Sequence, residues 1–335
     1  MKRFFLFLLG LAVFCIVAVT ALPELWRVFP RLTMLAPMAP QFAVVASVLL
    51  LTALLARRWV LALLCLAVAV WNTQLIWPDI TPLRAPAQAD SGRVLKVVNF
   101  NLYFHNERLD ETAAYLVNSG ADVIGLVEAR ARAKVGLAHL KEAYPYSIDC
   151  IGIEPECQTM LFSKYPLKNA YAGAVDGRYP TIAIAEVQLP GGAVTVGVTH
   201  LNTPFVTAPR PALASNAIDP APLLADAPRL EQSAQAANLA RFLAKQPEDL
   251  ILVGDFNSAP WSPIQIAFRA ATGLDNRGHF LPSWPSWTWP VFRLSLDQVF
   301  VRGRAQVTRI GLGPDVGSDH LPVVAEIAVQ PEPRQ

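Results

Sequence analysis

The chain has 335 residues, of which 53% are hydrophobic, and its formal net charge is +2. This length suits one large domain with an additional segment, and the hydrophobic fraction is higher than is usual for a soluble protein. The charge is divided unevenly, because residues 1–80 carry six Lys or Arg and two acidic residues whereas the rest carries 22 and 24. The larger part therefore lacks the basic excess that nonspecific nucleic-acid binding requires.

Three long apolar runs account for the excess hydrophobicity. They lie at about residues 4–22, 39–56 and 60–77. Runs of about 18 residues or more are long enough to cross a hydrocarbon core of about 30 Å as helices. We therefore predict that residues 1–80 form a membrane anchor of three transmembrane helices. The alternative is that the runs are core helices of a soluble protein.

Basic residues beside these runs predict the orientation of the chain. Two precede the first run and two fill the turn between the second and third, whereas two lie in the loop between the first and second (Lys2, Arg3; Arg57, Arg58; Arg27, Arg31). Because cytoplasmic loops carry the excess of Lys and Arg, everything after Trp77 is expected outside the cytoplasm. Alternatively, the first run is a signal peptide cleaved after Val19-Thr20-Ala21, which leaves the same final orientation.

The larger part of the chain contains two cysteines, Cys150 and Cys157, seven residues apart. Outside the cytoplasm these two residues could form a disulfide, and a two-cysteine metal site is the alternative. A formed disulfide would also argue against the reversed topology, in which this part of the chain lies in the cytoplasm.

Residues 81–93 are predicted to be a linker, since Pro82, Pro86 and Gly92 interrupt regular structure. Residues 94–330 then show short apolar runs and amphipathic segments that suit one α/β domain. We expect strands at 94–100, 123–127, 159–162, 181–188, 193–199, 250–253, 294–301 and 323–329, and helices at 108–118 and 230–245. A proline-rich stretch at 203–228 is predicted to be an exposed loop, either a lid over a site or a tolerated insertion.

Polar residues follow several of these strands at the point where each strand ends. Residues i and i+2 of an extended chain point the same way, so Asp255 and Asn257 can converge at the end of the 250–253 strand. Asp-x-Asn also occurs in turns that carry no chemistry. What favours a functional site is the presence of further polar groups at other strand ends: Asn101, Glu128, His200 with Asn202, Asp297, and Asp319 with His320.

The composition of this set indicates the chemistry. Carboxylate and amide oxygens suit a hard cation such as Mg²⁺ or Mn²⁺, whereas a zinc site would use more His or Cys. Two His beside carboxylates can move protons or donate to a phosphoryl oxygen. The chain has no glycine-rich phosphate loop with Lys and no Gly-x-Ser-x-Gly motif. The residues alone therefore predict metal-assisted hydrolysis with water as the nucleophile.

Six motifs in this order resemble a known family. They are residues 98–102, 124–128, 198–202, 253–257, 296–301 and 317–322. The chain is similar in these motifs to the endonuclease/exonuclease/phosphatase superfamily, which includes deoxyribonuclease I, and in its architecture to bacterial members with an N-terminal membrane anchor. The resemblance implies a four-layered α/β sandwich of two packed mixed sheets, preceded here by the three transmembrane helices, with the site at one rim.

The resemblance also implies roles for individual residues. Metal ligands are expected at Glu128, Asn101 and Asp319, with Asn101 binding or orienting beside Glu128. Asp255 resembles the carboxylate that activates water, and Asn257 resembles the amide that holds a phosphate oxygen. His200 and His320 resemble the two histidines that contact the phosphate, with His320 held by Asp297. Two simpler interpretations stay open, that Asn101 caps a turn and that Asp297 is a buried partner.

The expected function is a divalent-metal-dependent phosphoesterase of the inner membrane, with its catalytic domain on the periplasmic or extracellular side. The substrate is a phosphodiester or phosphomonoester, borne by nucleic acid, by a membrane lipid or by a soluble metabolite. The expected partners are this substrate and the bilayer, and no obligate protein partner is inferred. The alternative is a membrane-tethered scaffold or sensor of the same fold that has lost catalysis.

Overall fold

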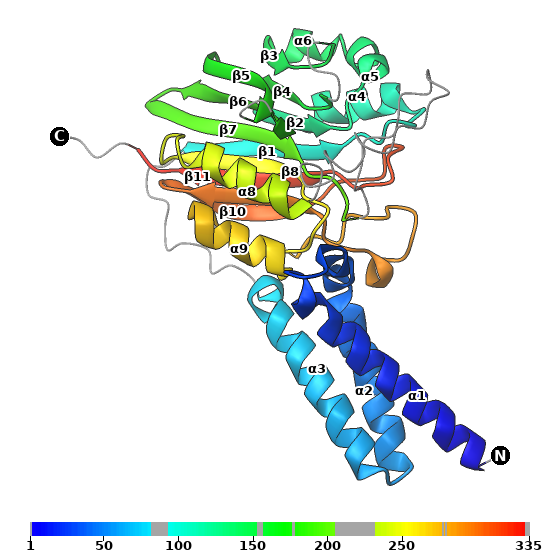
Figure 1. The fold of residues 1–335 in the computed structure, drawn as a ribbon. Helices are drawn as coiled ribbons and strands as arrows, with labels where there is room; N and C mark the ends of the chain where they lie inside the picture. The colour runs from blue at the N-terminus through cyan, green and yellow to red at the C-terminus, as the bar shows by residue number, and fades with distance from the viewer. Residues whose placement is uncertain are drawn as a thin grey trace, which may run out of the picture.

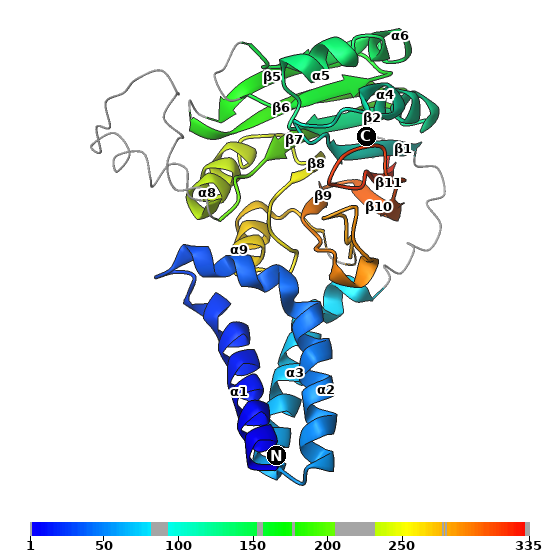
Figure 2. The same ribbon diagram turned by 90° about the vertical axis from the view of Figure 1, so that its right-hand side faces the viewer.

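The structure is a computed structural model that describes residues 2–81, 93–152, 157–175, 178–204, 232–276, 278 and 280–331. A bundle of three helices carries a larger α/β unit at one end (Figures 1 and 2). Most of the predicted linker at 81–93 and of the loop at 203–228 lies outside the described residues, as do the first residues of the helix predicted at 230–245.

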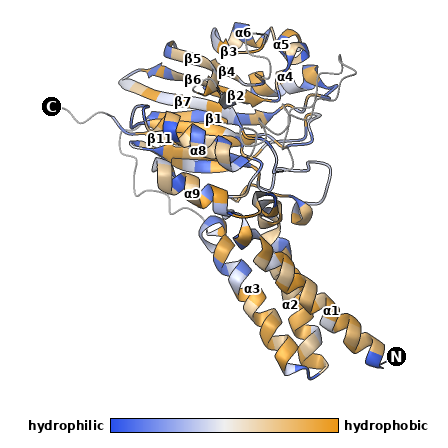
Figure 3. Ribbon diagram, in the orientation of Figure 1, coloured by the Kyte–Doolittle hydropathy of each residue, from blue (hydrophilic) through white to orange (hydrophobic). Residues whose placement is uncertain are grey.

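The bundle consists of α1 (Lys2–Ala21), α2 (Ala39–Leu55) and α3 (Trp59–Ile80). Two short 3₁₀ helices, η1 (Leu22–Leu25) and η2 (Pro30–Met38), connect α1 to α2 at the end nearest the α/β unit. By length and composition, the helical segments Lys2–Leu25, Arg31–Leu55 and Trp59–Ile80 are each able to cross a membrane. Their surface is apolar along most of its length (Figure 3). The prediction of three long apolar helices is confirmed.

The α/β unit contains two mixed sheets. The first has the strand order β10-β11-β1-β2-β4-β3 and the second β5-β6-β7-β8-β9. The only parallel neighbours among the described strands are β1 with β2 and β7 with β8. The strands are β1 (Arg93–Asn101), β2 (Val123–Val127), β3 (Tyr146–Asp149), β4 (Met160–Ser163), β5 (Leu167–Val175), β6 (Arg178–Leu189), β7 (Gly192–His200), β8 (Leu250–Asp255), β9 (Asp297–Arg302), β10 (Ala305–Leu312) and β11 (Val323–Val329).

The sheets pack face to face, with helices on both outer faces (Figure 1). Buried valines such as Val97, Val198 and Val253 fill the space between the sheets. The first sheet is covered by α4 (Leu109–Asn118), α5 (Ala131–Gly136) and α6 (Leu140–Ala143), and the second by α8 (Gln232–Leu243) and α9 (Pro263–Thr272). The predicted four-layered sandwich is therefore the observed architecture.

All eight predicted strands are confirmed within three residues at each end, but β3, β5, β10, α5, α6 and α9 were not predicted. The long strand β5 is mostly exposed in its first half and shows no alternation of apolar and polar residues, so its sequence carries little strand signal. Helix α9 does carry signals, a proline at its start and Gly273 at its end with φ of +68°.

A disulfide joins Cys150 to Cys157, whose Cα atoms lie 5.5 Å apart.

One glycine fixes how two strand ends approach each other. Gly254 has φ of +156°, and a Cβ atom at this position would collide with the carbonyl oxygen of Thr199 on the neighbouring strand. Only glycine therefore permits this close approach. The register beyond it pairs His200 with Asp255, so the last residues of β7 and β8 are side by side.

Candidate active site

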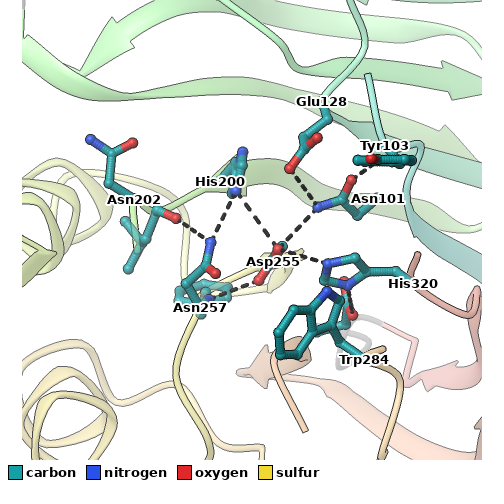
Figure 4. A network of polar contacts seen from close by, with 12 residues as sticks. Asn101, Tyr103, Glu128, His200, Asn202, Asp255, Asn257, Trp284 and His320 are labelled. Carbon is teal, nitrogen blue, oxygen red and sulfur yellow. Dashed lines mark hydrogen bonds and ion pairs between the residues drawn. The ribbon is translucent and has the colours of Figure 1, made fainter. Parts of the chain in front are cut away.

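The four strands of the two parallel pairs end at one rim of the sandwich. In the first sheet Asn101 is paired with Val127, which places Glu128 just beyond the strand end. In the second sheet His200 is paired with Asp255. Because the carboxyl ends of parallel strands meet at one edge, both pairs present their polar residues to the same space. These polar residues converge there (Figure 4).

Asp255 lies at the centre of this group and is only 1% exposed. Its Oδ2 atom accepts a hydrogen bond from Asn101 Nδ2 at 3.0 Å, and lies 3.7 Å from His200 Nε2 and 3.6 Å from His320 Nε2. Its Oδ1 atom accepts a hydrogen bond from the backbone N–H of Asn257 at 2.8 Å. A single carboxylate oxygen is therefore flanked by two imidazole nitrogens and an amide (Figure 4).

Asn101 links Asp255 to Glu128. Its Oδ1 accepts a hydrogen bond from the backbone N–H of Tyr103 at 2.9 Å, which identifies the other end of the amide as nitrogen. This Nδ2 donates to Glu128 Oε1 at 3.1 Å as well as to Asp255. A nitrogen donor is not a metal ligand, so this orientation suits the orienting role better than direct ligation. The metal role of Asn101 stays a prediction.

Three residues around the rim have left-handed backbone conformations. The φ angles are +54° at Glu128, +57° at Tyr103 and +47° at Asn257. Such angles are uncommon for residues other than glycine and cost of order 1 kcal/mol or more each. Their concentration at one rim shows that the surrounding fold holds Glu128 and Asn257 in these positions against local preference.

His320 is held from behind by a buried carboxylate. Its Nδ1 lies 2.7 Å from Asp297 Oδ2, which also accepts a hydrogen bond from the hydroxyl of Ser283 at 2.6 Å. Burial opposes the charged form, but the nearby charges of Asp297 and Asp255 raise the pKa of His320 to about 10. The imidazole is therefore protonated at neutral pH, with Nδ1–H donating to Asp297 and Nε2 facing Asp255. The predicted contact between Asp297 and His320 is present.

Asp319 precedes His320 in the chain and also lines the cavity. Its Oδ2 accepts a hydrogen bond from Trp284 Nε1 at 3.1 Å, whereas its buried Oδ1 has no hydrogen-bond partner among the described residues. Burial raises the pKa of Asp319 above its usual value, and the charges of Glu128 and Asp255 add to this rise. A cation would relieve the repulsion between these carboxylates, so the donor set fits Mg²⁺ or Mn²⁺.

A second group of potential ligands fits a metal less well. Donor atoms of Asp255, Asp297 and His320 lie within 4.8 Å of one another. However, Asp297 Oδ2 is already joined by hydrogen bonds to His320 Nδ1 and to the hydroxyl of Ser283. Glu128 and Asp319 are therefore the better candidates for the metal.

His200 and Asn257 complete the polar group. The amide nitrogen of Asn257 donates to the carbonyl of Leu201 at 2.8 Å and lies 3.1 Å from His200 Nε2. Gln232 is buried and its Nε2 donates to the carbonyl oxygen of Asn257 at 3.0 Å, which holds this turn in place. His200 and Asn257 thus face the same space from the second sheet.

A cavity of about 370 Å³ opens at this rim. Its polar lining consists of Glu128, His200, Asn202, Thr203, Asp255, Asn257, Asp319 and His320. Its apolar lining consists of Met34, Pro37, Pro204, Trp284, Leu294 and Leu296. Of the eight predicted site residues six line the cavity, whereas Asn101 and Asp297 are buried behind it.

Sequence reasoning missed four residues that shape the site, Ser283, Trp284, Gln232 and Met34. Ser283 and Trp284 begin a Trp-rich segment, residues 283–290, in which the sequence predicts that residues 288–290 pack under the rim instead of binding substrate. That expectation is wrong for Trp289, which is 77% exposed. Three histidines lie outside every motif, which predicts surface positions for them; His105 and His139 are exposed, and His279 lies outside the described residues.

Comparison with known proteins gives one family match. The model of the Endonuclease/Exonuclease/phosphatase family matches residues 98–320. No curated protein sequence matches this chain.

Several solved structures share the fold. One is a humanized TDP2 from D. rerio, with 16% identity, a TM-score of 0.51, and coverage of 70% of this chain and 98% of that one. Another is an endonuclease/exonuclease/phosphatase from Beutenbergia cavernae, with 19% identity, a TM-score of 0.51, and coverage of 71% and 72%. A third is a beta toxin variant from Staphylococcus aureus with bound magnesium ions, with 17% identity, a TM-score of 0.51, and coverage of 70% and 99%. At these identities the likeness shows the fold alone.

Proposed function

Because the chain belongs to the endonuclease/exonuclease/phosphatase family, we propose that it is a metal-dependent phosphoesterase held in a membrane by its N-terminal helices. The observation that carries this proposal is the position of Asp255 Oδ2, which lies between Asn101 and the two histidines at the floor of the cavity. A buried carboxylate in such a setting can take a proton from water beside a phosphate.

Glu128 and Asp319 would hold the divalent cation, Mg²⁺ or Mn²⁺. Both carboxylates line the cavity, and Asp319 Oδ1 has no other partner among the described residues. When bound, the cation neutralises charge on the phosphate and on the departing oxygen. Asn101 keeps Glu128 in place through its hydrogen bond to Oε1.

The chain's own residues perform the remaining steps. Asp255 orients the attacking water and accepts its proton. His320, which carries a positive charge, stabilises the phosphoryl oxygens as their charge grows, and His200 and Asn257 face the phosphate from the opposite side. Asp297 does not touch the substrate, and it acts by fixing the ring and charge of His320.

The membrane orientation is part of the proposal. The Cys150–Cys157 disulfide suits an oxidising compartment, and the basic residues beside the apolar helices favour the same topology. Both observations support a catalytic domain on the periplasmic or extracellular side of an inner membrane.

The test is hydrolysis of a soluble aryl phosphodiester and the matching monoester by the full chain in lipid nanodiscs. Turnover is measured with Mg²⁺, with Mn²⁺ and with EDTA. We expect turnover that EDTA abolishes and that falls at least about 10²-fold in Glu128→Ala and in His320→Ala.

Glu142→Ala and His139→Ala are the matched controls, because both residues are exposed and neither lines the cavity. Equal losses in the controls would indicate damage to the fold instead of the site. A folded wild-type chain without turnover on either ester would favour the inactive scaffold over the enzyme.

A further inference from the structure

Part of the cavity wall comes from the membrane anchor. Met34 and Pro37 line the cavity together with the catalytic residues, and both belong to η2, between the first and second apolar helices. Figure 2 shows this segment lying across the end of the bundle, between the helices and the α/β unit. The site is therefore not a property of the α/β unit alone.

Close packing fixes this wall in place. The indole Nε1 of Trp261 donates a hydrogen bond to the carbonyl of Ala36 at 2.7 Å. Ala39 and Ile76, from the ends of α2 and α3, pack with Ala259 and Trp261 in one buried cluster. The α/β unit thus rests directly on the end of the bundle, and the cavity lies at the level where the apolar helices end.

Exposed aromatic side chains lie near the same end of the helix bundle as the cavity. Trp287, Trp289 and Phe292 are 78%, 77% and 64% exposed. Gln41, in the first turn of α2, donates from Nε2 to the carbonyl of Val291 at 2.9 Å, which places this aromatic loop beside the start of the helix. Aromatic residues at the end of a membrane-spanning helix are typical of the lipid–water interface, where the ring meets the lipid and the N–H meets water.

The cavity lining suits a ligand with two unlike ends. Carboxylates and histidines from the strand ends and the loop before β11 form its polar part, and Met34, Pro37 and Leu294 belong to its apolar part. None of the described residues that line the cavity is Lys or Arg, so the cavity has no row of basic side chains that could bind a polyanion such as a nucleic acid. A phosphate ester with an attached hydrocarbon chain matches both sides.

We propose that the substrate is a lipid phosphate ester of the leaflet that meets the catalytic domain, an inference that rests on the proposed phosphoesterase function. The phosphate enters the polar side of the cavity while the hydrocarbon chains stay in the bilayer, beside Met34 and the aromatic loop. In the reaction, a bond forms between water oxygen and phosphorus, the bond from phosphorus to one ester oxygen breaks, and the released alcohol leaves with a proton.

The experiment compares two substrates in one preparation. The full chain is reconstituted in vesicles of phosphatidylcholine, phosphatidylethanolamine and phosphatidylglycerol in equal parts, with Mg²⁺ present. Release of phosphorylated head groups or of free alcohols is followed by mass spectrometry, and hydrolysis of a soluble aryl phosphodiester is followed in parallel. The test variant is Trp287→Ser/Trp289→Ser. The control is Val135→Ser/Tyr146→Ser, two exposed apolar residues on α5 and β3, at the far end of the α/β unit (Figure 1).

We expect the wild type to cleave vesicle lipid, and the ratio of lipid to aryl-ester turnover to fall about tenfold or more in the test variant but not in the control. Cleavage of the aryl ester without cleavage of any vesicle lipid would overturn the lipid proposal and leave the phosphoesterase proposal intact. An equal fall in both activities would also overturn it, because the loop would then support the fold. Absence of both activities in the wild type would reject the phosphoesterase proposal itself.

Discussion

The two sides of the cavity are built in different ways. The polar side comes from residues at the ends of β2, β7 and β8 and from Asp319 and His320 in the loop before β11. Two residues of the apolar wall, Met34 and Pro37, come from η2, more than 200 residues before Asp255 in the chain, and this segment is held by the hydrogen bond from Trp261 to the carbonyl of Ala36. Under the proposed function, residues at the rim perform the chemistry, and the segment between the first two apolar helices contributes to the choice of substrate.

This division implies that substitutions on the two sides will have different kinetic signatures. Changes on the polar side remove stabilisation of the transition state and lower kcat. Changes in the wall weaken the binding of the apolar part of the substrate and raise KM. The following predictions test that difference, from the largest expected effect to the smallest.

Asp255→Asn is expected to lower kcat by about 10³-fold or more, because an amide cannot accept the proton from water. KM should change little, since the replacement has the same size and its amide oxygen still accepts one of the two hydrogen bonds that Asp255 receives from Asn101 and Asn257. Steady-state kinetics on the soluble aryl phosphodiester measure both quantities, with Asp110→Asn on the exposed start of α4 as control. A rise in KM with kcat unchanged would show that Asp255 binds substrate and does no proton transfer.

Asp297→Asn is expected to lower kcat by about 10²-fold, also with little change in KM. The reason is that His320 loses the carboxylate that orients its ring and stabilises its positive charge. Ser283→Ala removes the hydroxyl that donates to the same oxygen and should give a smaller loss of the same kind, of roughly two- to tenfold. If Ser283→Ala raised KM instead, the hydrogen bonds that link Ser283, Asp297 and His320 would not serve to position His320.

Met34→Gln is expected to raise KM by about fivefold for a phosphodiester with a long alkyl group, because the wall loses about 1 kcal/mol of apolar contact. The methyl ester of the same phosphate should show a much smaller change. Met38→Gln is the matched control, since Met34 and Met38 are both 37% exposed but only Met34 lines the cavity. A loss confined to kcat would contradict the assignment of the wall to binding.

Trp261→Phe is expected to have the smallest effect, a loss of about 1 kcal/mol in stability, because it removes one hydrogen bond and leaves the carbonyl of Ala36 without its donor. The thermal midpoint of the chain in nanodiscs should fall by a few degrees. Trp59→Phe, at the exposed start of α3, should leave the midpoint unchanged. An unchanged midpoint in Trp261→Phe would indicate that the wall does not depend on this contact.

Sequence reasoning identified the residues that the structure brings together on the polar side but not those of the wall, and the reason is physical. A strand end and a polar residue just beyond it are local features, so Glu128, His200 and Asp255 could be assigned from short segments. The position of Met34 depends on how the bundle docks on the α/β unit, which no local pattern contains. Ser283 and Trp284 lie in an irregular loop, whose path is set by tertiary contacts to Asp297 and Asp319.

The fold was also predictable in part. The buried strands β2 and β8 have short continuous apolar runs, and β1 and β11 are mostly apolar with Lys96, Asn99 and Glu326 as interruptions, so their sequence identifies them. The strands β5 and β10 lie at the edges of their sheets and are half-exposed, so the pattern that marks a buried strand is absent from them. Edge strands are therefore where sequence reasoning on this fold was weakest.

The pairing of β1 with β11 has a consequence for how a cell makes this protein. The ribosome delivers the anchor first, but β1 is separated from its antiparallel neighbour by almost the whole domain. The first sheet therefore cannot be completed until the last strand has been translated, and the loop that carries Asp319 and His320 arrives just before it. The corner of the site that contains Asp319 and His320 is therefore absent until β11 can pair with β1, so a partly made chain contains Glu128, His200 and Asp255 without these two residues.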